Sequence, residues 1–473
     1  MRVIRFDNKG WRARFEDGFD PENISRIADA FAYIWADANP GSTIMVGYDT
    51  RFNGRGFATL VAGVLASYGL RVLVSSEPCP TPALGWSVAR DPDAKGGVML
   101  TASSASCEFG GITARGEDGG PVPMDFYEAA SRIISSVPVT NRSSFSYVDI
   151  AEPYLRHLRS MVNAEAIASA SLDVVVDPMH GAGRGYLRAL LASLGCRVHE
   201  LHGDLDPEFG GLHPQVSEPW VDTCEHAIHA YNSNLGFVLD GDGDRFAAID
   251  GSGRLVSPHK ATPLLIEHLI KNRNEWGRVV VTHSCSEYVR RQAQYLGCEL
   301  TAVPMGFKRI YDEFIEGDVL LGAEEYGGIC IPSHLPERDG IMASLLLVEY
   351  VAMSGKSLSD LVDAMEKRLG HMCYIRRSIR LDVASIQSFR NVLPGINPHK
   401  VCDMTPSVVG HSDGLILRFD NGSWVQLRPS RTEALVRACA EAPNADLANR
   451  LVEEACNEAK AHLPAFGDSR KMQ

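Results

Sequence analysis

The sequence predicts an α/β protein: three α/β units in tandem, followed by a small α+β domain. Helical and strand patterns alternate along most of the chain, with Gly- and Pro-rich turns between them. The C-terminal part instead has three strand-like segments in succession and ends in one helix. In addition, 473 residues are too many for one ordinary hydrophobic core, so several domains are expected.

The first unit opens with an amphipathic helix. Asp20 stands at its N-cap position, Pro21 at its first turn, and apolar side chains recur at helical spacing up to Trp35. Asn39-Pro40-Gly41 ends this helix. A largely parallel, buried sheet is expected next to it. Its patterns are a strand at 42–49, a helix at 56–70, and strands at 71–76 and 96–103.

The later units are read in the same way, and the Ser-rich stretch at 135–146 separates the first from the second. The second unit has strand patterns at 172–177, 196–202, 236–240 and 246–250 and a helix at 185–195. The third has helices at 260–272 and 341–355 and strands at 278–284 and 318–325. The tail has strands at 374–382, 414–420 and 423–430 and a helix at 445–463. We therefore predict domains at 1–145, 146–256, 257–371 and 372–473.

Composition and charge exclude several classes. Hydrophobic residues make up 45% and charged residues 22%, as in typical globular proteins. With 59 Asp+Glu against 46 Lys+Arg, the net charge of −13 argues against nucleic acid or an anionic membrane as the main partner. An anionic substrate would need a local cluster of basic groups. No signal region or membrane span is evident, so we expect a cytoplasmic protein.

The eleven cysteines form no C-x-x-C pair and are odd in number, which indicates reduced thiols rather than disulfides or a zinc site.

The segment "VLDGDGDRFAAID" (238–250) places three carboxylates, Asp240, Asp242 and Asp244, in a tight Gly-rich loop. Such carboxylates repel one another unless a cation neutralises them, and oxygen ligands favour Mg²⁺ or Ca²⁺. An EF-hand is excluded, because its sixth position is Arg245 instead of Gly and its twelfth is Gly251 instead of Glu. A solvated Asp-Gly hairpin turn is the alternative. Arg245 is suited to pair with a phosphate on the metal.

Two further loops carry polar side chains after predicted strands. "MLTASSASCEFGGIT" brings Ser103 to the carboxyl end of a strand, where ligands gather in α/β sheets, although a run of serines is also typical of a linker. "RPSRTEALVR" (428–437) offers closely spaced guanidinium and hydroxyl donors, typical of a phosphate site or of an exposed basic turn.

Two other segments have competing interpretations. Glu324 and Glu325, in "LLGAEEYGG", are placed either to accept hydrogen bonds from sugar hydroxyls or to form an exposed acidic turn. "DPMHGAGRGY" is a dinucleotide-site alternative, since Gly181-x-Gly183 follows a strand and opens a helix; Tyr186 stands where the third glycine is required.

Taken together, these segments resemble the α-D-phosphohexomutase superfamily, the phosphoglucomutases and phosphomannomutases, in matching order along nearly the whole chain. Its loops T-A-S-H-N-P, D-G-D-x-D-R, G-E-x-S-G-H and R-x-S-G-T-E correspond to "TASSAS", "DGDGDR", "AEEYGG" and "RPSRTE". The flanking segments "KGWRA", "VGYDTR", "MGFK" and "PERDGIMA" also resemble family motifs.

The resemblance implies four domains with mixed sheets around a central cleft, and a phosphoryl group carried on Ser103. It implies Mg²⁺ bound by Ser103 and the three aspartates, with a hexose 1,6-bisphosphate as intermediate and activator. The remaining roles that it implies are positive charge near the cleft from Arg12 and Lys308, sugar contacts from Glu324 and Tyr326, and a site for the non-reacting phosphate at Arg428, Ser430, Arg431 and Thr432.

Several positions depart from the family pattern. His-Asn-Pro has become Ser104-Ala105-Ser106, the later N-G-x-K has become 110–113 without its proton-moving lysine, and Ser-Gly-His has become 326–328. His334, in "SHLPERDG", is expected to stand in for the lost histidine. Losing a proton-transfer group costs about 10²- to 10⁴-fold in rate.

Three hypotheses follow. The first is a mutase interconverting glucose or mannose 1- and 6-phosphates, as a monomer or homodimer. The second is an impaired paralogue that binds a sugar phosphate or a partner protein. The third is a nicotinamide-dependent oxidoreductase.

Overall fold

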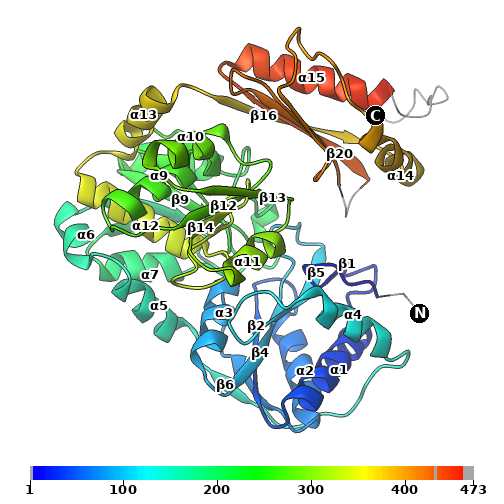
Figure 1. Cartoon of the computed structure of the whole chain (residues 1–473). Helices are drawn as coiled ribbons and strands as arrows, with labels where there is room; N and C mark the ends of the chain where they lie inside the picture. Colours follow the sequence, from blue (N-terminus) through cyan, green and yellow to red (C-terminus); the bar gives the residue numbers. More distant parts are fainter. Residues whose placement is uncertain (1–3, 431–433, 462–473) are drawn as a thin grey trace.

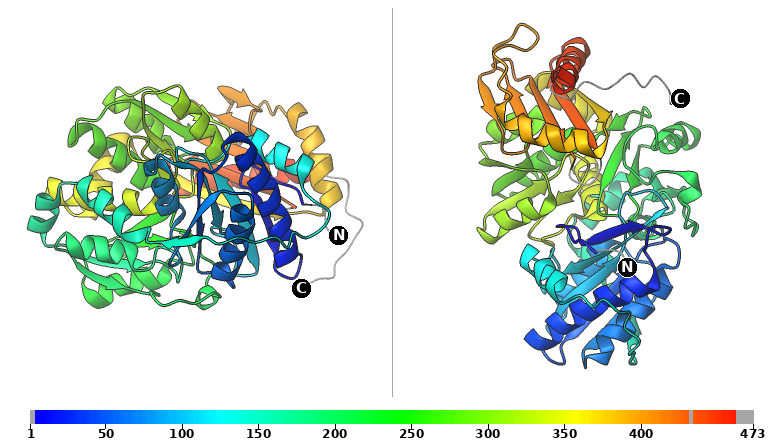
Figure 2. Two further views of the ribbon diagram at one scale, coloured as in Figure 1. Left: turned by 90° about the horizontal axis from the view of Figure 1, so that it is seen from below. Right: turned by 90° about the vertical axis from the view of Figure 1, so that its right-hand side faces the viewer.

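The computed structural model describes residues 4–430 and 434–461 as four domains, each with its own sheet. Domains I and IV lie at opposite ends, with domains II and III between them (Figure 1). The two views of Figure 2 show the same arrangement from below and from the side. The predicted class, three α/β domains with mixed sheets and a C-terminal α+β domain, is therefore confirmed.

Domain I has a six-stranded sheet in the order β1-β5-β4-β2-β3-β6. Strands β2, β3, β4 and β6 are parallel, as the alternating pattern predicts, whereas β1 and β5 form an antiparallel edge. The side chain of Asp20 caps α1 by accepting a hydrogen bond from the Asn23 N–H at 2.8 Å, as predicted. The elements are β1 (Trp11–Arg14), α1 (Pro21–Ala38), β2 (Thr43–Tyr48), α2 (Gly54–Ser67), β3 (Arg71–Ser75), α3 (Thr81–Arg90), β4 (Ala94–Leu100), β5 (Phe109–Arg115), α4 (Met124–Ile133) and β6 (Ser146–Val148).

The first boundary differs from the prediction. Residues 146–148 form β6, which pairs with β3 at the edge of the domain I sheet, so domain I extends to Val148 instead of ending at residue 145. The Ser-rich stretch that marked the boundary is the connection that leads into this edge strand.

Domain II has a five-stranded sheet in the order β11-β10-β9-β7-β8, with β10 and β11 antiparallel to their neighbours. Its elements are α5 (Ala151–Ser160), α6 (Ala164–Ala170), β7 (Asp173–Asp177), α7 (Tyr186–Ser193), β8 (Arg197–Glu200), the 3₁₀ turn η1 (Phe209–Gly211), α8 (Asp222–Tyr231), β9 (Leu235–Leu239), β10 (Phe246–Asp250) and β11 (Leu255–Val256).

Domain III has a four-stranded sheet in the order β13-β12-β14-β15. Its helix α12 is apolar almost all round and is buried against both α6 of domain II and α9, so domains II and III share one core. The elements are α9 (Pro258–Lys271), β12 (Arg278–Thr282), α10 (Glu287–Leu296), β13 (Leu300–Val303), α11 (Phe307–Ile315), β14 (Val319–Ala323), β15 (Ile329–Cys330), α12 (Gly340–Ser354) and α13 (Leu358–Leu369).

Domain IV is an antiparallel sheet in the order β16-β20-β19-β18-β17, packed against α15 (Figure 1). It is joined to domain III through Glu441, whose carboxylate accepts hydrogen bonds from the Ser286 hydroxyl at 2.5 Å and the Glu287 N–H at 2.6 Å. Its elements are β16 (Cys373–Arg380), α14 (Val383–Val392), η2 (Leu393–Gly395), β17 (Val408–Gly410), β18 (Leu415–Arg418), β19 (Trp424–Pro429), β20 (Leu435–Ala442) and α15 (Ala445–Ala461).

Within the described residues, no single helix has the length and apolar composition needed to cross a membrane. Only α12 and α13 taken together meet these two criteria, and the two helices are bent by 87° at their junction.

Candidate active site

A pocket of about 510 Å³, partly open to solvent, lies where domains I, II and III meet. Ser103 of domain I and Asp242 and Asp244 of domain II line it. A local excess of basic side chains surrounds them, as the acidic net charge of the chain requires for an anionic ligand. These basic residues are Lys9, Arg12, Arg115, Lys308 and Arg338.

The predicted carboxylate cluster is present in the loop between β9 and β10. Carboxylate oxygens of Asp240, Asp242 and Asp244 all lie within 4.8 Å of one another, and all three residues are buried. The Thr81 hydroxyl donates to Asp242 Oδ2 at 2.6 Å. Among the described residues, the buried Oδ1 atoms of Asp242 and Asp244 have no hydrogen-bond partner, which is costly unless a cation takes that role. The donor set, all hard oxygen, fits Mg²⁺.

The charges of this cluster are unevenly balanced. Burial and the neighbouring Asp244 and Asp242 raise the pKa of Asp240 well above its ordinary value, and burial with Asp244 raises the pKa of Asp242. Burial acts on Asp244 as well, but the charges of Arg338 and Arg245 outweigh it and lower that pKa. A bound cation would therefore stabilise the ionised forms of Asp240 and Asp242, which burial and the neighbouring negative charges disfavour.

Ser103 lies directly against this cluster. Its hydroxyl donates to Asp240 Oδ2 at 3.2 Å, and the residue is 5% exposed. The backbone at Ser103 has a φ of +52°, which is uncommon outside glycine and marks a strained position. Its N–H donates to Thr101 Oγ1 at 2.8 Å. With this backbone conformation, three residues after the end of β4, the Ser103 hydroxyl faces Asp240 of domain II.

The serine loop is held by Arg51, which we did not single out from the sequence. Its guanidinium donates to the carbonyl oxygens of Ser103 at 2.6 Å and of Ala105, Ser106 and Phe109 at 2.6 to 3.1 Å. Asp49 Oδ2 accepts from both Arg51 Nε at 3.1 Å and the Thr101 hydroxyl at 2.6 Å. The only sequence signal was the matching segment "VGYDTR", which carried no assigned role.

Two arginines connect the metal loop to the rest of the pocket. Arg245 Nη1 donates to Ser104 Oγ at 2.8 Å, so the predicted phosphate ligand Arg245 lies beside the serine loop. Arg338, in the segment "PERDG", pairs with Asp244 at 2.7 Å and with Glu324 at 2.9 Å. The role of Arg338 was also missed, because its partners lie far away in the sequence.

The two predicted cleft cations, Arg12 and Lys308, both line the pocket. Arg12 is on β1, opposite Gly111 of β5. Lys308 Nζ donates to Asp312 Oδ1 at 2.6 Å and lies 4.3 Å from the centre of the Tyr311 ring.

The predicted sugar loop is buried at the end of β14. Glu324 is paired with Arg338, as described above, and the Tyr326 ring is covered by the guanidinium of Arg376 from domain IV at 5.0 Å. Glu325 receives hydrogen bonds from Thr282 and Ser284. These acids are therefore not the exposed turn that was the alternative, although neither Glu324 nor Tyr326 is among the lining residues of the pocket.

His334 lies outside the pocket lining. Its Nε2 is 2.9 Å from Asp339 Oδ2 and its Nδ1 is 3.0 Å from His157 Nε2, in a buried network beside the start of α12. Asp339 is the N-cap of that helix. The sequence position of His334, on the loop before a helix, does not show which way its side chain points. In the structure its ring points toward Asp339, the buried N-cap residue of α12. This placement argues against the proton-transfer role that we predicted for His334.

In the predicted phosphate loop, Arg428 NH2 lies 3.4 Å from Glu325 Oε1, which joins domain IV to the sugar loop. The Ser430 N–H donates to the Leu435 carbonyl at 2.8 Å, and the Ser430 carbonyl accepts from Arg390. Arg431 and Thr432 lie outside the described residues.

The segment "GAGRGY" supports the metal loop rather than a dinucleotide. The Ala182 N–H donates to the Gly241 carbonyl at 2.9 Å, and Glu200 accepts from the Gly185 N–H at 2.7 Å and from Arg188. Glu200 is therefore engaged locally, instead of being free to contact a ribose.

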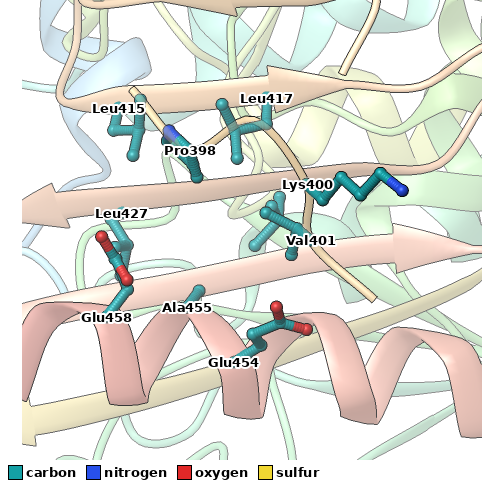
Figure 3. Close-up of a pocket in the computed structure, with 10 residues that line it drawn as sticks. Pro398, Lys400, Val401, Leu415, Leu417, Leu427, Glu454, Ala455 and Glu458 are labelled. Atoms are coloured by element: carbon teal, nitrogen blue, oxygen red, sulfur yellow. The ribbon is translucent and has the colours of Figure 1, made fainter. Parts of the chain in front are cut away.

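A second cavity, of about 370 Å³, lies between the sheet of domain IV and α15. Figure 3 shows Leu415, Leu417 and Leu427 from the strands facing Glu454 and Ala455 of the helix. None of the predicted site residues that the structure describes lines it, so it is separate from the pocket at Ser103.

Comparisons with known proteins agree with this geometry. Models of the phosphoglucomutase/phosphomannomutase family match all four domains: its α/β/α domain I over residues 3–138, domain II over 152–253, domain III over 257–369 and its C-terminal domain over 383–458.

Individual relatives cover nearly the whole chain. A phosphoglucomutase/phosphomannomutase from Thermococcus kodakarensis is 28% identical over 95% of this chain and 96% of its own. A phosphoglucosamine/phosphogalactosamine mutase from Sulfurisphaera tokodaii is 26% identical over 95% and 97%. A crystal structure from Thermus thermophilus that carries the name phosphomannomutase superposes with a TM-score of 0.87 at 28% identity, over 97% and 99% of the two chains.

Four family models in the expected order, relatives aligned from end to end, and a buried serine against three aspartates all lead to one assignment. The chain belongs to the phosphoglucomutase/phosphomannomutase family of the α-D-phosphohexomutase superfamily.

Proposed function

We propose that this chain interconverts a hexose 1-phosphate and a hexose 6-phosphate, with glucose or mannose as the sugar, through a phosphoryl group carried on Ser103. The observation that carries the proposal is the hydrogen bond of the Ser103 hydroxyl to Asp240, inside a buried cluster of three carboxylates flanked by arginines. Phosphoryl transfer needs a positioned acceptor oxygen and positive charge around the transferred group, and this pocket supplies both.

Asp240, Asp242 and Asp244, together with an oxygen on Ser103, would hold Mg²⁺. The buried Oδ1 atoms of Asp242 and Asp244, which accept no hydrogen bond from the described residues, support this fit. When bound, the ion supplies neutralisation of the charge that develops on the transferred phosphoryl group.

The protein's own residues provide the rest. Arg51 holds the serine loop through its hydrogen bond to the Ser103 carbonyl. Arg245 would contact the phosphoryl group, and its hydrogen bond to Ser104 supports this role. Lys308 and Arg12 raise the positive potential of the pocket. The phosphate that does not react would bind at the loop from Arg428 to Thr432, and the sugar at Glu324 and Tyr326; both assignments rest on the family resemblance.

Turnover tests the proposal directly. Purified protein with Mg²⁺ and a trace of glucose 1,6-bisphosphate should convert glucose or mannose 1-phosphate to the 6-phosphate, followed by ³¹P NMR. Because relatives named for amino sugars also match, glucosamine 1-phosphate belongs in the same assay. Peptide mass spectrometry should detect a phosphoryl group on residues 101–106 of the wild type. Ser103→Ala should remove this group and abolish conversion. Ser106→Ala, in the same loop, is the matched control.

The impaired-paralogue hypothesis makes a different forecast. If calorimetry detects sugar phosphate binding while wild type converts none of the three substrates faster than Ser103→Ala, the chain binds without catalysis and the mutase proposal is wrong.

A further inference from the structure

The proposed reaction needs a group that moves a proton. As the phosphoryl group passes from Ser103 to a sugar hydroxyl, the hydroxyl proton must leave and Ser103 Oγ must gain one. Thr113 stands where the family resemblance expects a lysine, and its hydroxyl contacts the Arg115 guanidinium at 3.1 Å and Tyr127 at 3.2 Å. His334 is buried outside the pocket. The proton carrier must therefore come from another element.

Two amines line the pocket within the described chain, and they differ in their surroundings. Lys308 Nζ is held by Asp312 at 2.6 Å and by the Tyr311 ring. Lys9 Nζ makes no hydrogen bond or ion pair with any residue of 4–430 or 434–461. Lys9 is therefore the amine that remains available to a ligand.

The backbone fixes the position of Lys9. Asp7 and Gly10 exchange two backbone hydrogen bonds of 2.9 and 3.1 Å around the turn Asn8-Lys9, and the Lys9 N–H donates to Asp7 Oδ1 at 2.7 Å. Gly10 has a φ of +87°, and a Cβ there would lie 2.2 Å from the Ile112 carbonyl and 2.9 Å from Thr113 Cα. Only glycine fits such a contact, so the turn is pressed against the strand position where the lysine is missing.

The electrostatics favour an amine that can lose its proton. Burial, with the charges of Arg245 and Arg12, lowers the pKa of Lys9 to about 8. Charged groups face it from four elements: Arg12 on β1, Asp244 and Arg245 in the loop between β9 and β10, Glu324 after β14 and Arg338 before α12. The carboxylates of Glu324 and Asp244 oppose the shift.

We propose that Lys9 is the proton carrier of this active site, replacing from the N-terminal turn a lysine that β5 does not supply. The inference rests on the mutase function proposed above. The neutral amine accepts the proton of the attacking sugar hydroxyl while the bond from phosphorus to that oxygen forms. The bond from phosphorus to Ser103 Oγ breaks, its electron pair stays on Oγ, and Lys9 delivers the proton there. Atoms and charge balance without a further reactant.

The test compares Lys9→Met and Lys9→Arg with wild type in the mutase assay, with phosphoserine content measured alongside. Arginine keeps the positive charge but cannot accept a proton at neutral pH. Both variants should lose about 10²- to 10⁴-fold in kcat with KM nearly unchanged. The rise of wild-type kcat as pH increases through about 8 should disappear. Adding Thr113→Lys to Lys9→Met should restore part of the rate. Lys95→Met, which removes a surface pair with Glu117, is the control.

The outcomes separate the two proposals. If wild type itself does not turn over, the mutase function fails, and the Lys9 mechanism fails with it. If wild type turns over and Lys9→Met keeps its kcat and pH profile, only the Lys9 proposal is overturned. A Lys9→Arg variant that works like wild type while Lys9→Met has a raised KM would assign Lys9 to phosphate binding, and would also overturn it.

Discussion

Replacing Arg51 by methionine should dismantle the serine loop. Arg51 is 4% exposed, and its guanidinium satisfies four backbone carbonyls between Ser103 and Phe109 as well as the carboxylate of Asp49. Methionine fills a similar volume without any donor, so these five acceptors would lose the guanidinium. Asp49 would keep the Thr101 hydroxyl as a donor, and the Ser106 carbonyl would keep the Phe109 N–H.

The expected loss in the free energy of unfolding follows from the burial of the groups that Arg51 contacts. Asp49 is 2% exposed, and removing the cation from a buried pair costs about 3–5 kcal/mol. Each carbonyl that finds no water costs roughly another 1–3 kcal/mol, but the loop can open to solvent, so these costs do not add. We expect a loss of at least about 3 kcal/mol in the free energy of unfolding of domain I. Burial already raises the pKa of Asp49, and losing Arg51 raises it further, so acidification should reduce the destabilisation.

The assay combines urea unfolding at pH 7 and at pH 5 with hydrogen exchange of residues 101–115 and phosphoserine content. Arg55→Met is the matched control. Arg55 is exposed, lies four residues away, and contacts the exposed Tyr147 side chain, with its guanidinium 5.2 Å from the centre of that ring. Unchanged unfolding in Arg51→Met, together with unchanged exchange protection of the loop, would refute the argument that this arginine builds the site.

Three further predictions concern the metal loop, the domain joint and the phosphate loop. Asp240→Asn should stabilise the metal-free protein at neutral pH, because a buried carboxyl whose pKa is raised lowers stability at pH values above its ordinary pKa. The same variant should show a smaller rise in melting temperature on adding Mg²⁺ than the wild type. A variant that keeps the full rise contradicts the assignment of Asp240 as a ligand. Glu441→Ala should lower the free energy of unfolding by roughly 2 kcal/mol, because the Ser286 hydroxyl loses its acceptor. It should also speed proteolysis between α13 and β16. Equal cleavage rates in the variant and the wild type would contradict the role of Glu441 in joining domains III and IV. Arg428→Met, which removes the contact with Glu325, should raise KM about tenfold without lowering phosphoserine content, as steady-state kinetics would show.

Much of the fold could be predicted because its signals are local. The capped helix from Pro21 and the apolar strands next to it are determined by residues adjacent in sequence, and α12 is apolar almost all round. The antiparallel edge formed by β1 and β5 was missed, since two glycines of low strand propensity follow Phe109 in "FGGITAR". That edge is stabilised by pairing with β1, across almost a hundred residues of intervening chain.

The candidate site likewise has a part that local sequence signals predict and a part that depends on contacts between distant residues. The cluster of three carboxylates could be predicted because Asp240, Asp242 and Asp244 are two residues apart and one turn brings them together. Arg51 contacts carbonyls more than fifty residues away and Arg338 pairs with Asp244 of another domain, so no local spacing reveals these two roles. The surroundings of His334 were not evident for a related reason: its partner His157 belongs to α5 and becomes a neighbour only when domains II and III pack together.

The altered loops have a consistent physical explanation in this chain. Ser104 now accepts a hydrogen bond from Arg245, and a Cβ at Gly111 would lie 2.2 Å from the Thr101 carbonyl, so this stretch of β5 packs against the base of the serine loop. Thr113 is tied to Arg115 and Tyr127. Side chains committed to packing in this way cannot also carry a mobile proton. A mutase reaction in this pocket then requires a proton carrier from an element other than β5, and the turn that holds Lys9, which packs against β5, meets that condition.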